Sequence, residues 1–354
     1  MTTLAGRTAI GLDIGTSGVR AAELSFGKRG VTLERFGQIA LLPGVVRDGE
    51  VMDAGALADA LRQLWASTSF SHKQVTLGIA NQRVVVRQVE LPWLPERELR
   101  ASLAFQVQDY LPMPVEQAVL DFHPVEEISV PGQPRLLRGL LVAAVREVVL
   151  ANVNAVQGAG LRVTGVDLTS FAVLRSMGSS GAADADTVAL VDIGAKVTNI
   201  VVHRAGVPLF VRILLLGGQD VTDAVCETLG VATVDAEALK QLPTLAGYDF
   251  AQLAEAKRAA DEGAAVFVDE VRSSLDYFAA SSPGERLQRL VLTGGGSRLN
   301  GLAERLEAAT RLPVVLGNPL RSLQIGRTGL TDEQLDFVQP LAAVPVGLAL
   351  GAVR

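Results

Sequence analysis

The sequence predicts a two-lobed α/β protein with one insertion in each lobe, and three glycine-rich turns carry this prediction. Two of them are near-repeats, AIGLDIGTSGVRAAEL at 9–24 and ALVDIGAKVTNIVV at 189–202, and each reads as an apolar strand, Asp-Ile-Gly, and a second apolar strand. The third is Thr293-Gly-Gly-Gly-Ser297, between a strand at 289–292 and a helix at 302–310. Matching hairpins so far apart indicate two lobes of similar construction.

Composition is that of a globular protein. The chain has 354 residues, of which 49% are hydrophobic and 20% charged, a length typical of two to three domains. Its net charge of −6 and lack of a basic tract disfavour nucleic-acid binding. A single cysteine, Cys226, and three scattered histidines support neither a disulfide nor a zinc site. No stretch reads as a signal peptide or membrane span, so we expect a soluble cytoplasmic protein.

Lobe one is predicted over 1–91, completed by 167–183 and 340–354. Its expected elements are strands at 34–42, 74–79 and 83–91 and a helix at 54–67. The C-terminal segment 347–354 is small and apolar, which suits a helix packed under this lobe.

The first insertion is predicted over 92–166, after the break at Pro92-Trp-Leu-Pro95. It reads as a helix at 96–110, strands at 118–127 and 135–144, a helix at 147–157 and a strand at 162–166.

Lobe two is predicted over 184–218 and 283–339, after a Gly/Ser-rich linker at 178–184. The second insertion, 219–282, is mainly helical, with Val268, Val271, Leu275 and Phe278 on one helix face.

The turns have the chemistry of a phosphate and metal site. Asp13 and Asp192 stand at the ends of apolar strands, where a carboxylate needs a cation or donors, and Mg²⁺ would satisfy both. Backbone N–H groups of 15–18, and of the corresponding turn at Gly194 and Ala195, can line an anion site. The Gly294–Gly296 turn leaves room for a base or ribose, which Arg298 could cover or leave for solvent. Walker A and GxGxxG motifs are absent, so the P-loop and dinucleotide-binding classes are excluded.

This triad of turns resembles the actin, Hsp70 and sugar-kinase superfamily, with its ribonuclease H-like fold, over the whole chain. Within it the sequence is similar to the PilM family of type IV pilus assembly proteins, which is related to the division protein FtsA. The segments that carry the resemblance are 101–114, 120–122, 209–222, 235–240 and 272–276. The resemblance implies that 92–166 is a 1C subdomain of the SHS2 type and 219–282 a 2B subdomain.

ATP and Mg²⁺ are the implied cofactors. By resemblance Glu237 bonds the ribose and Lys240 lies against adenine, while Lys196 meets either a γ-phosphate or solvent. The metal ligands are then Asp13 and Asp192, and the cofactor-binding residues are Gly15, Thr16, Ser17, Gly18, Gly194, Ala195, Lys196, Thr198, Gly217, Gly218, Glu237, Lys240, Gly294, Gly295, Gly296 and Arg298. Only Asp167 offers a loose match for a residue that orients attacking water, so weak or absent ATPase activity is expected.

The family further implies a scaffold at the inner face of the membrane that binds the N-terminal cytoplasmic peptide of PilN between lobe one and the insert. Other platform proteins and self-association are further expected contacts. Candidate groove residues are Trp93, Leu99, Leu103, Phe105, Val107, Tyr110, Leu111 and Met113. Two alternatives stay open: a division protein, which would need a basic amphipathic tail, and a small-molecule kinase, which would need a carboxylate base.

Overall fold

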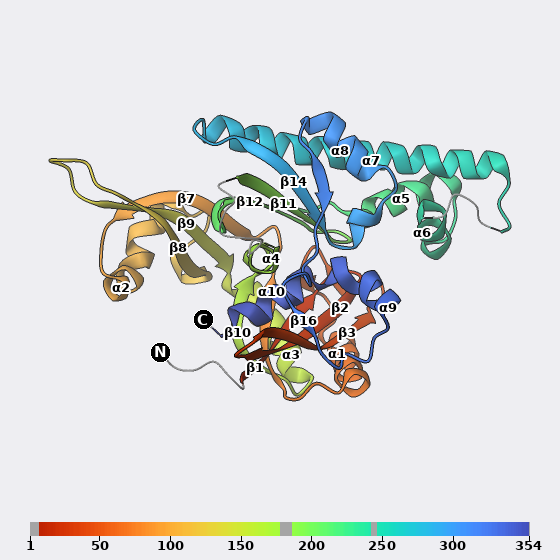
Figure 1. Ribbon diagram of the computed structural model, residues 1–354, viewed down its shortest axis with the longest axis horizontal. Helices are drawn as coiled ribbons and strands as arrows, with labels where there is room; N and C mark the ends of the chain where they lie inside the picture. The colour runs from red at the N-terminus through yellow and green to blue at the C-terminus, as the bar shows by residue number, and fades with distance from the viewer. Residues whose placement is uncertain (1–6, 178–185, 242–245, 354) are drawn as a thin grey trace.

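The computed structural model describes residues 7–177, 186–241 and 246–353. Two lobes, each built on one sheet, stack on each other, and a smaller unit projects to one side (Figure 1). No helix in these ranges is long and apolar enough to cross a membrane.

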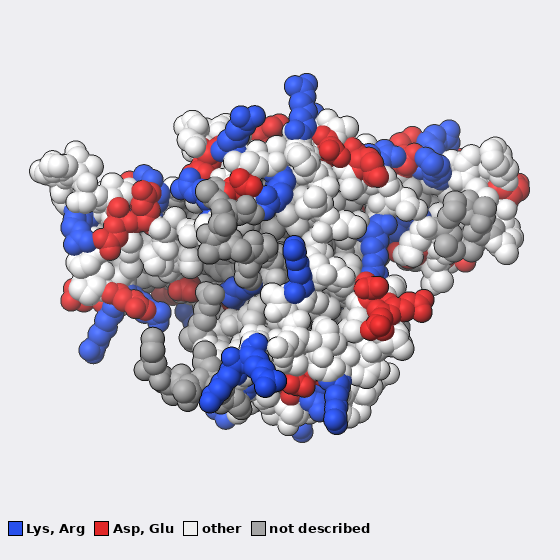
Figure 2. Space-filling model, viewed as in Figure 1, with Lys and Arg blue, Asp and Glu red and all other residues white. Residues whose placement is uncertain are grey.

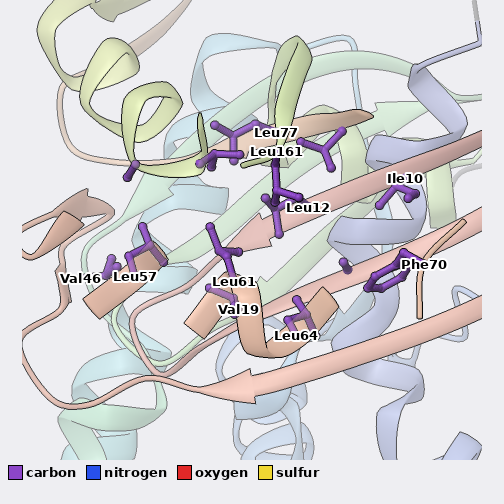
Figure 3. Close-up of a cluster of buried hydrophobic side chains, with 14 of the residues drawn as sticks. Ile10, Leu12, Val19, Val46, Leu57, Leu61, Leu64, Phe70, Leu77 and Leu161 are labelled. Atoms are coloured by element: carbon purple, nitrogen blue, oxygen red, sulfur yellow. The ribbon is translucent and has the colours of Figure 1, made fainter. Parts of the chain in front are cut away.

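Lobe one is built on a six-stranded sheet in the order β10-β6-β1-β2-β3-β16. The strands are β1 (Arg7–Ile14), β2 (Gly18–Gly27), β3 (Gly30–Ala40), β6 (Gln74–Ile79), β10 (Arg162–Leu168) and β16 (Gln324–Ile325). Helices α1 (Ala54–Thr68) and α3 (Arg146–Gly158) pack on one face, where Ile10 and Leu12 meet Leu57 and Leu61 (Figure 3). Helix α10 (Ala343–Gly351) covers the other face, against Ala22 and Leu24. Period-2 alternation along β1 and β2 thus supplies both cores.

The smaller unit is a three-stranded sheet in the order β7-β9-β8, formed by β7 (Val84–Pro92), β8 (Ala118–Ile128) and β9 (Leu136–Val145). Helix α2 (Glu96–Val107) buries Leu99, Leu103 and Val107 against it. Short turns of 3₁₀ helix, η1 (Gln108–Tyr110) and η2 (Val115–Gln117), lead into β8. The tiny hairpin β4 (Val46–Arg47) and β5 (Glu50–Val51) stands apart, in lobe one.

Strand pairing differs from the predicted insert, 92–166, at both ends. The strand expected at 83–91 is β7, which pairs with β9 over Val84–Pro92 instead of joining the lobe-one sheet. The helix and strand expected at 147–157 and 162–166 are α3 and β10, and both belong to lobe one. Propensity identifies a strand but not its partner, because pairing depends on residues distant in the sequence.

Lobe two has a five-stranded sheet in the order β13-β12-β11-β14-β15. Its strands are β11 (Thr187–Ile193), β12 (Thr198–Arg204), β13 (Val207–Leu214), β14 (Leu287–Thr293) and β15 (Val314–Leu316). The long helix α7 (Phe250–Ser281) places Val268, Val271, Leu275 and Phe278 in the core with α8 (Leu302–Thr310), as the stripe predicted. Helices α5 (Gly218–Leu229) and α6 (Thr233–Gln241) pack beside the first half of α7 (Figure 1).

Two helices lie between the sheets and join the lobes. Helix α4 (Thr169–Met177) packs with α10 and with β11 and β12 in one buried cluster. The backbones approach so closely that a Cβ on Gly347 would overlap the carbonyl oxygen of Ala172, and one on Gly11 would overlap that of Pro345. Segment α9 (Asp332–Val338) with the 3₁₀ turn η4 (Gln339–Ala342) leads into α10, and the predicted C-terminal helix is confirmed.

We expect Gly347→Ala to destabilise the fold by about 2–3 kcal/mol, because the added methyl group overpacks a backbone contact that cannot yield. Chemical denaturation measures the change. Gly158→Ala is the matched control, since nothing lies within 4 Å of the added Cβ at the exposed end of α3, and it should be neutral or mildly stabilising. Equal stability of the two variants would contradict the packing described.

Candidate functional site

A cavity of about 590 Å³ lies between the lobes, where the three glycine-rich turns converge. That volume is typical of small-molecule sites. The predicted site residues that line it are Asp13, Gly15, Thr16, Ser17, Asp192, Gly194, Ala195, Gly218, Glu237, Lys240, Gly294, Gly295 and Gly296. Residues more than 280 positions apart in the sequence therefore meet at one place.

The two Asp-Ile-Gly hairpins close in the same way. The N–H of Gly15 donates to the carbonyl of Gly18 at 3.0 Å, and the N–H of Gly194 donates to that of Val197 at 3.0 Å. The first glycine of each turn therefore uses its donor internally, contrary to the expectation that Gly15 N–H faces an anion. Thr16 and Ser17 form the tip of the first turn at the cavity wall.

The third turn packs against the end of β11. Gly294 has φ of 82°, and a Cβ there would overlap the carbonyl of Ile193, so only glycine fits. The hydroxyl of Thr293 and the N–H of Gly294 both donate to the carbonyl of Pro340, at 3.1 and 3.0 Å. The turn is thereby tied to the segment that leads into α10.

Two carboxylates define the electrostatics of the cavity. Burial raises the pKa of Asp13, against a lowering by the charge of Arg20, whose Nη1 lies 3.8 Å from Asp13 Oδ2. Burial and the nearby Asp13 charge raise the pKa of Asp192 to about 7, although Asn199 and Arg20 partly offset this. The Nε of Arg20 is buried without a hydrogen-bond acceptor. The cavity is thus lined by two carboxylates whose charged forms are disfavoured and by one cation, Arg20.

Asn199, which we did not predict, links Asp192 of lobe two to helix α4, which lies between the lobes. Its amide donates to Asp192 Oδ2 at 3.3 Å, while its carbonyl accepts the hydroxyls of Thr169 at 2.9 Å and Ser170 at 2.8 Å. Those hydroxyls come from α4, and Asn199 comes from β12. The available signal was an amide at the start of a strand whose central residues, 200–202, are apolar.

Glu237 and Lys240 form an ion pair at 2.6 Å on α6. Lys240 is 9% exposed and also donates to the carbonyl of Gly218 at 3.0 Å and the hydroxyl of Thr222 at 2.8 Å. Burial raises the pKa of Glu237, but hydrogen bonds from Lys240 and Thr222 outweigh it, and the net shift is downward. The pair is charged and faces the cavity from lobe two.

Three predicted residues support the turns without lining the cavity. A Cβ on Gly18 would lie 2.7 Å from the carbonyl of Ile39. Thr198 is fully buried and donates to the carbonyl of Leu216 at 2.7 Å. Gly217 donates its N–H to Asp220, which caps α5.

Lys196 and Arg298 were predicted as possible ligand contacts, but their side chains bind other parts of the protein. Lys196 binds Asp220 and Asp223 at 2.9 and 2.6 Å; partial burial lowers its pKa, but the two acids outweigh this and raise it. Arg298 lies 4.3 Å over the ring of Phe337 and donates to the Phe337 carbonyl. Neither lines the cavity.

Asp167, the weak candidate for orienting water, also lies outside the cavity. It pairs with Arg175, whose Nε donates to the carbonyl of Gly347 at 2.9 Å. Its place is between α4 and α10, where it supports their packing. The prediction that this residue contacts a reacting group is not supported by its position.

We expect Asp192→Asn to stabilise the ligand-free protein at pH 8, because the folded pKa of about 7 lies above the unfolded value of 3.8. The stability that Asp192 contributes when protonated is lost as pH rises through 7. The advantage of the variant should shrink by on the order of 2 kcal/mol between pH 8 and pH 5. Denaturant titrations in EDTA at both values measure it. A stability difference that does not change with pH would mean that folding does not raise the pKa of Asp192.

The comparisons agree with this architecture. The family model described as type IV pilus assembly protein PilM matches residues 11–353. A solved PilM-PilN type IV pilus biogenesis complex is 28% identical, with 98% of each chain covered and a TM-score of 0.85. EutJ of Carboxydothermus hydrogenoformans (17% identity, 98% and 90% covered, TM-score 0.58) and ADP-bound MreB5 of Spiroplasma citri (13%, 90% and 93%, 0.50) share the fold. The predicted actin-like fold is thus confirmed, and the chain belongs to the PilM family of type IV pilus assembly proteins.

Proposed function

We propose that this pilus assembly protein is a nucleotide-dependent scaffold that binds ATP and Mg²⁺ in the cavity between its lobes. The observation that carries the proposal is the pair of strained carboxylates, Asp13 and Asp192, beside three turns whose glycines bring backbone to the cavity wall. Magnesium is commonly held by one or two carboxylates together with phosphate oxygens. A cation here would offset both the burial and the repulsion from Asp13 that raise the Asp192 pKa.

The residues present fit the cofactor. Asp13 and Asp192 would hold the metal, directly or through its waters, and the turn tips at Thr16, Ser17 and Ala195 would meet phosphates. Arg20 also lines the cavity beside Asp13, so its charge would attract the phosphates. When bound, the metal nucleotide supplies a charge that both lobes contact.

Lobe two supplies a nucleoside pocket in this proposal. Glu237 would accept from ribose hydroxyls, because its charged form is held by Lys240 and Thr222. The base would lie between Lys240 and the Gly294–Gly296 turn, with Leu341 at its side. MreB5 of Spiroplasma citri, which has the same fold, was solved with ADP, and this supports a nucleotide ligand.

We expect Asp13→Asn to lower Mg·ATP affinity at least tenfold, because one of two carboxylates that attract the cation is lost. Calorimetry with Mg²⁺ and then with EDTA measures it, and the variant should match the parent in EDTA. Asp235→Asn, an exposed carboxylate on the first turn of α6, is the control and should bind normally. Unchanged Mg·ATP affinity in the Asp13 variant would refute the metal assignment.

The proposed partner is the N-terminal cytoplasmic peptide of PilN, which would hold the protein at the inner face of the cytoplasmic membrane. A PilM-PilN complex is a known relative, which supports this partner. Of the candidate groove residues, Leu99, Leu103 and Val107 are core, and Trp93, Leu111 and Met113 are half-buried. Other platform proteins or further copies of the chain would bind elsewhere on the scaffold.

Two aromatic side chains remain exposed in the smaller unit. Phe105 is 77% exposed on α2 and Tyr110 is 39% exposed in η1, the short turn that follows α2. Arg87 of β7 donates to the Tyr110 carbonyl at 3.3 Å, which fixes η1 against the sheet. Exposed aromatic anchors on a rigid support are typical of peptide-binding surfaces.

We expect Phe105→Ala/Tyr110→Ala to weaken binding of the PilN peptide at least tenfold, since two apolar anchors are removed. Fluorescence anisotropy with a labelled peptide measures it. The matched control is Tyr277→Ala, an exposed aromatic on α7 in lobe two, and it should bind as the parent does. Normal affinity in the double variant would place the peptide on another surface.

A further inference from the structure

At one end of the lobe-one sheet, where its strands meet the connecting turns, there is one basic residue for each of the six strands. The cavity lies at the opposite end, where β1 ends and β2 begins. Strand pairing aligns β1, β6 and β10 in parallel, with β2 running back, so their far ends come together. In sheet order, the cations at this end are Arg162, Lys73, Arg7, Lys28, Arg29 and Arg321.

The register places these residues at nearly one level. Arg7 pairs with Phe26, two residues before Lys28, and Arg162 pairs with Gln74, next to Lys73. Gln324 pairs with Thr32 and donates to the Arg29 carbonyl at 3.2 Å, and Arg321 stands three residues before Gln324. At about 3.3 Å per residue, the six lie within roughly 10 Å of one level along the strands.

The row is exposed and unneutralised. All six side chains are exposed, and within the described ranges none of them forms an ion pair. The connections at this end, 27–30, 69–73, 157–161 and 317–323, contain no Asp or Glu. In Figure 2, Lys and Arg gather on the lower part of lobe one, near the start of β1. In a chain of net charge −6, such a row is a concentrated exception.

We propose that this row, Arg162, Lys73, Arg7, Lys28, Arg29 and Arg321, binds the anionic headgroups of a lipid bilayer. The cations follow this end of the sheet instead of a groove, and such a row suits a flat anionic surface. Single-stranded nucleic acid sites combine a basic groove with exposed aromatic stacking platforms. Here the aromatic side chains Phe26, Trp65 and Phe70 pack into lobe one.

The choice of a membrane rests on the proposed function, which places the protein beside the cytoplasmic membrane, but the charge row does not depend on PilN. Each basic side chain near an anionic leaflet adds roughly fivefold to partitioning. Single weak signals give reversible membrane binding, and two together give stable anchoring. The row would therefore act as the second signal, orienting a protein that a membrane partner already holds.

The test uses the full chain and extruded vesicles, without PilN peptide. Sedimentation compares vesicles of 30% anionic phosphatidylglycerol with neutral phosphatidylcholine at 50 and 300 mM salt. We expect binding to anionic vesicles only, weakened at high salt because exposed charges are screened. Lys28→Glu/Arg29→Glu, in an exposed hairpin turn, should lower this binding at least tenfold.

The control, Lys257→Glu/Arg258→Glu on α7, makes the same change of net charge in lobe two and should bind vesicles as the parent does. Both variants should bind PilN peptide normally, which shows that they are folded and separates this proposal from the partner assignment. Equal loss in both variants, no parent binding at 50 mM salt, or tighter binding to an RNA oligonucleotide than to vesicles would overturn the proposal.

Discussion

The contact of α10 with β1 on one side and α4 on the other is the constraint on which the rest of the structure depends. Backbone meets backbone at Gly11 and Gly347, so no side chain separates the helix from its neighbours. Because α4 also packs on the lobe-two sheet, this contact fixes the distance between the two lobes. The cavity lies between the lobes at this fixed separation, where glycine-rich turns line the space and leave it unfilled by side chains.

Within this frame, the site buries two carboxylates, Asp13 and Asp192, without a protein cation close enough to neutralise them. Arg20 approaches Asp13 at 3.8 Å, beyond hydrogen-bonding distance, and its Nε finds no acceptor. Asn199 donates only one weak hydrogen bond to Asp192. Burying carboxylates in this way costs stability, and such costs are common at sites that await a ligand.

Much of the fold and of the cavity lining could be predicted from the sequence, because turns, strand periodicity and glycine placement are local signals. The residues predicted from the turns, such as Asp13, Gly194 and Gly295, do meet at one cavity, although their role as ligand contacts stays a prediction. Sheet membership of β7 and β10 could not be predicted, since it depends on which distant strand offers a matching edge.

Long charged side chains were the other failure, for a related reason. Lys196 and Arg298 stand in the predicted turns, yet each reaches a partner on another element, Asp220 and Phe337 respectively. A flexible side chain can reach several partners at similar cost, so its position in a motif does not determine its direction. Asn199 was missed because Thr198 and His203 are polar residues of the same strand, so one more polar residue there gives no distinct pattern.

The carbonyl of Pro340 connects the glycine-rich turn of lobe two, at the cavity wall, to the opposite lobe. It accepts two hydrogen bonds from the Thr293–Gly294 turn, and it belongs to η4, which continues directly into α10. A shift of the turn would therefore move η4 and, with it, the start of α10. If one partner displaces α10 and a ligand displaces the turn, the two are coupled. Each then changes the affinity for the other by the same factor, because coupling free energies are reciprocal.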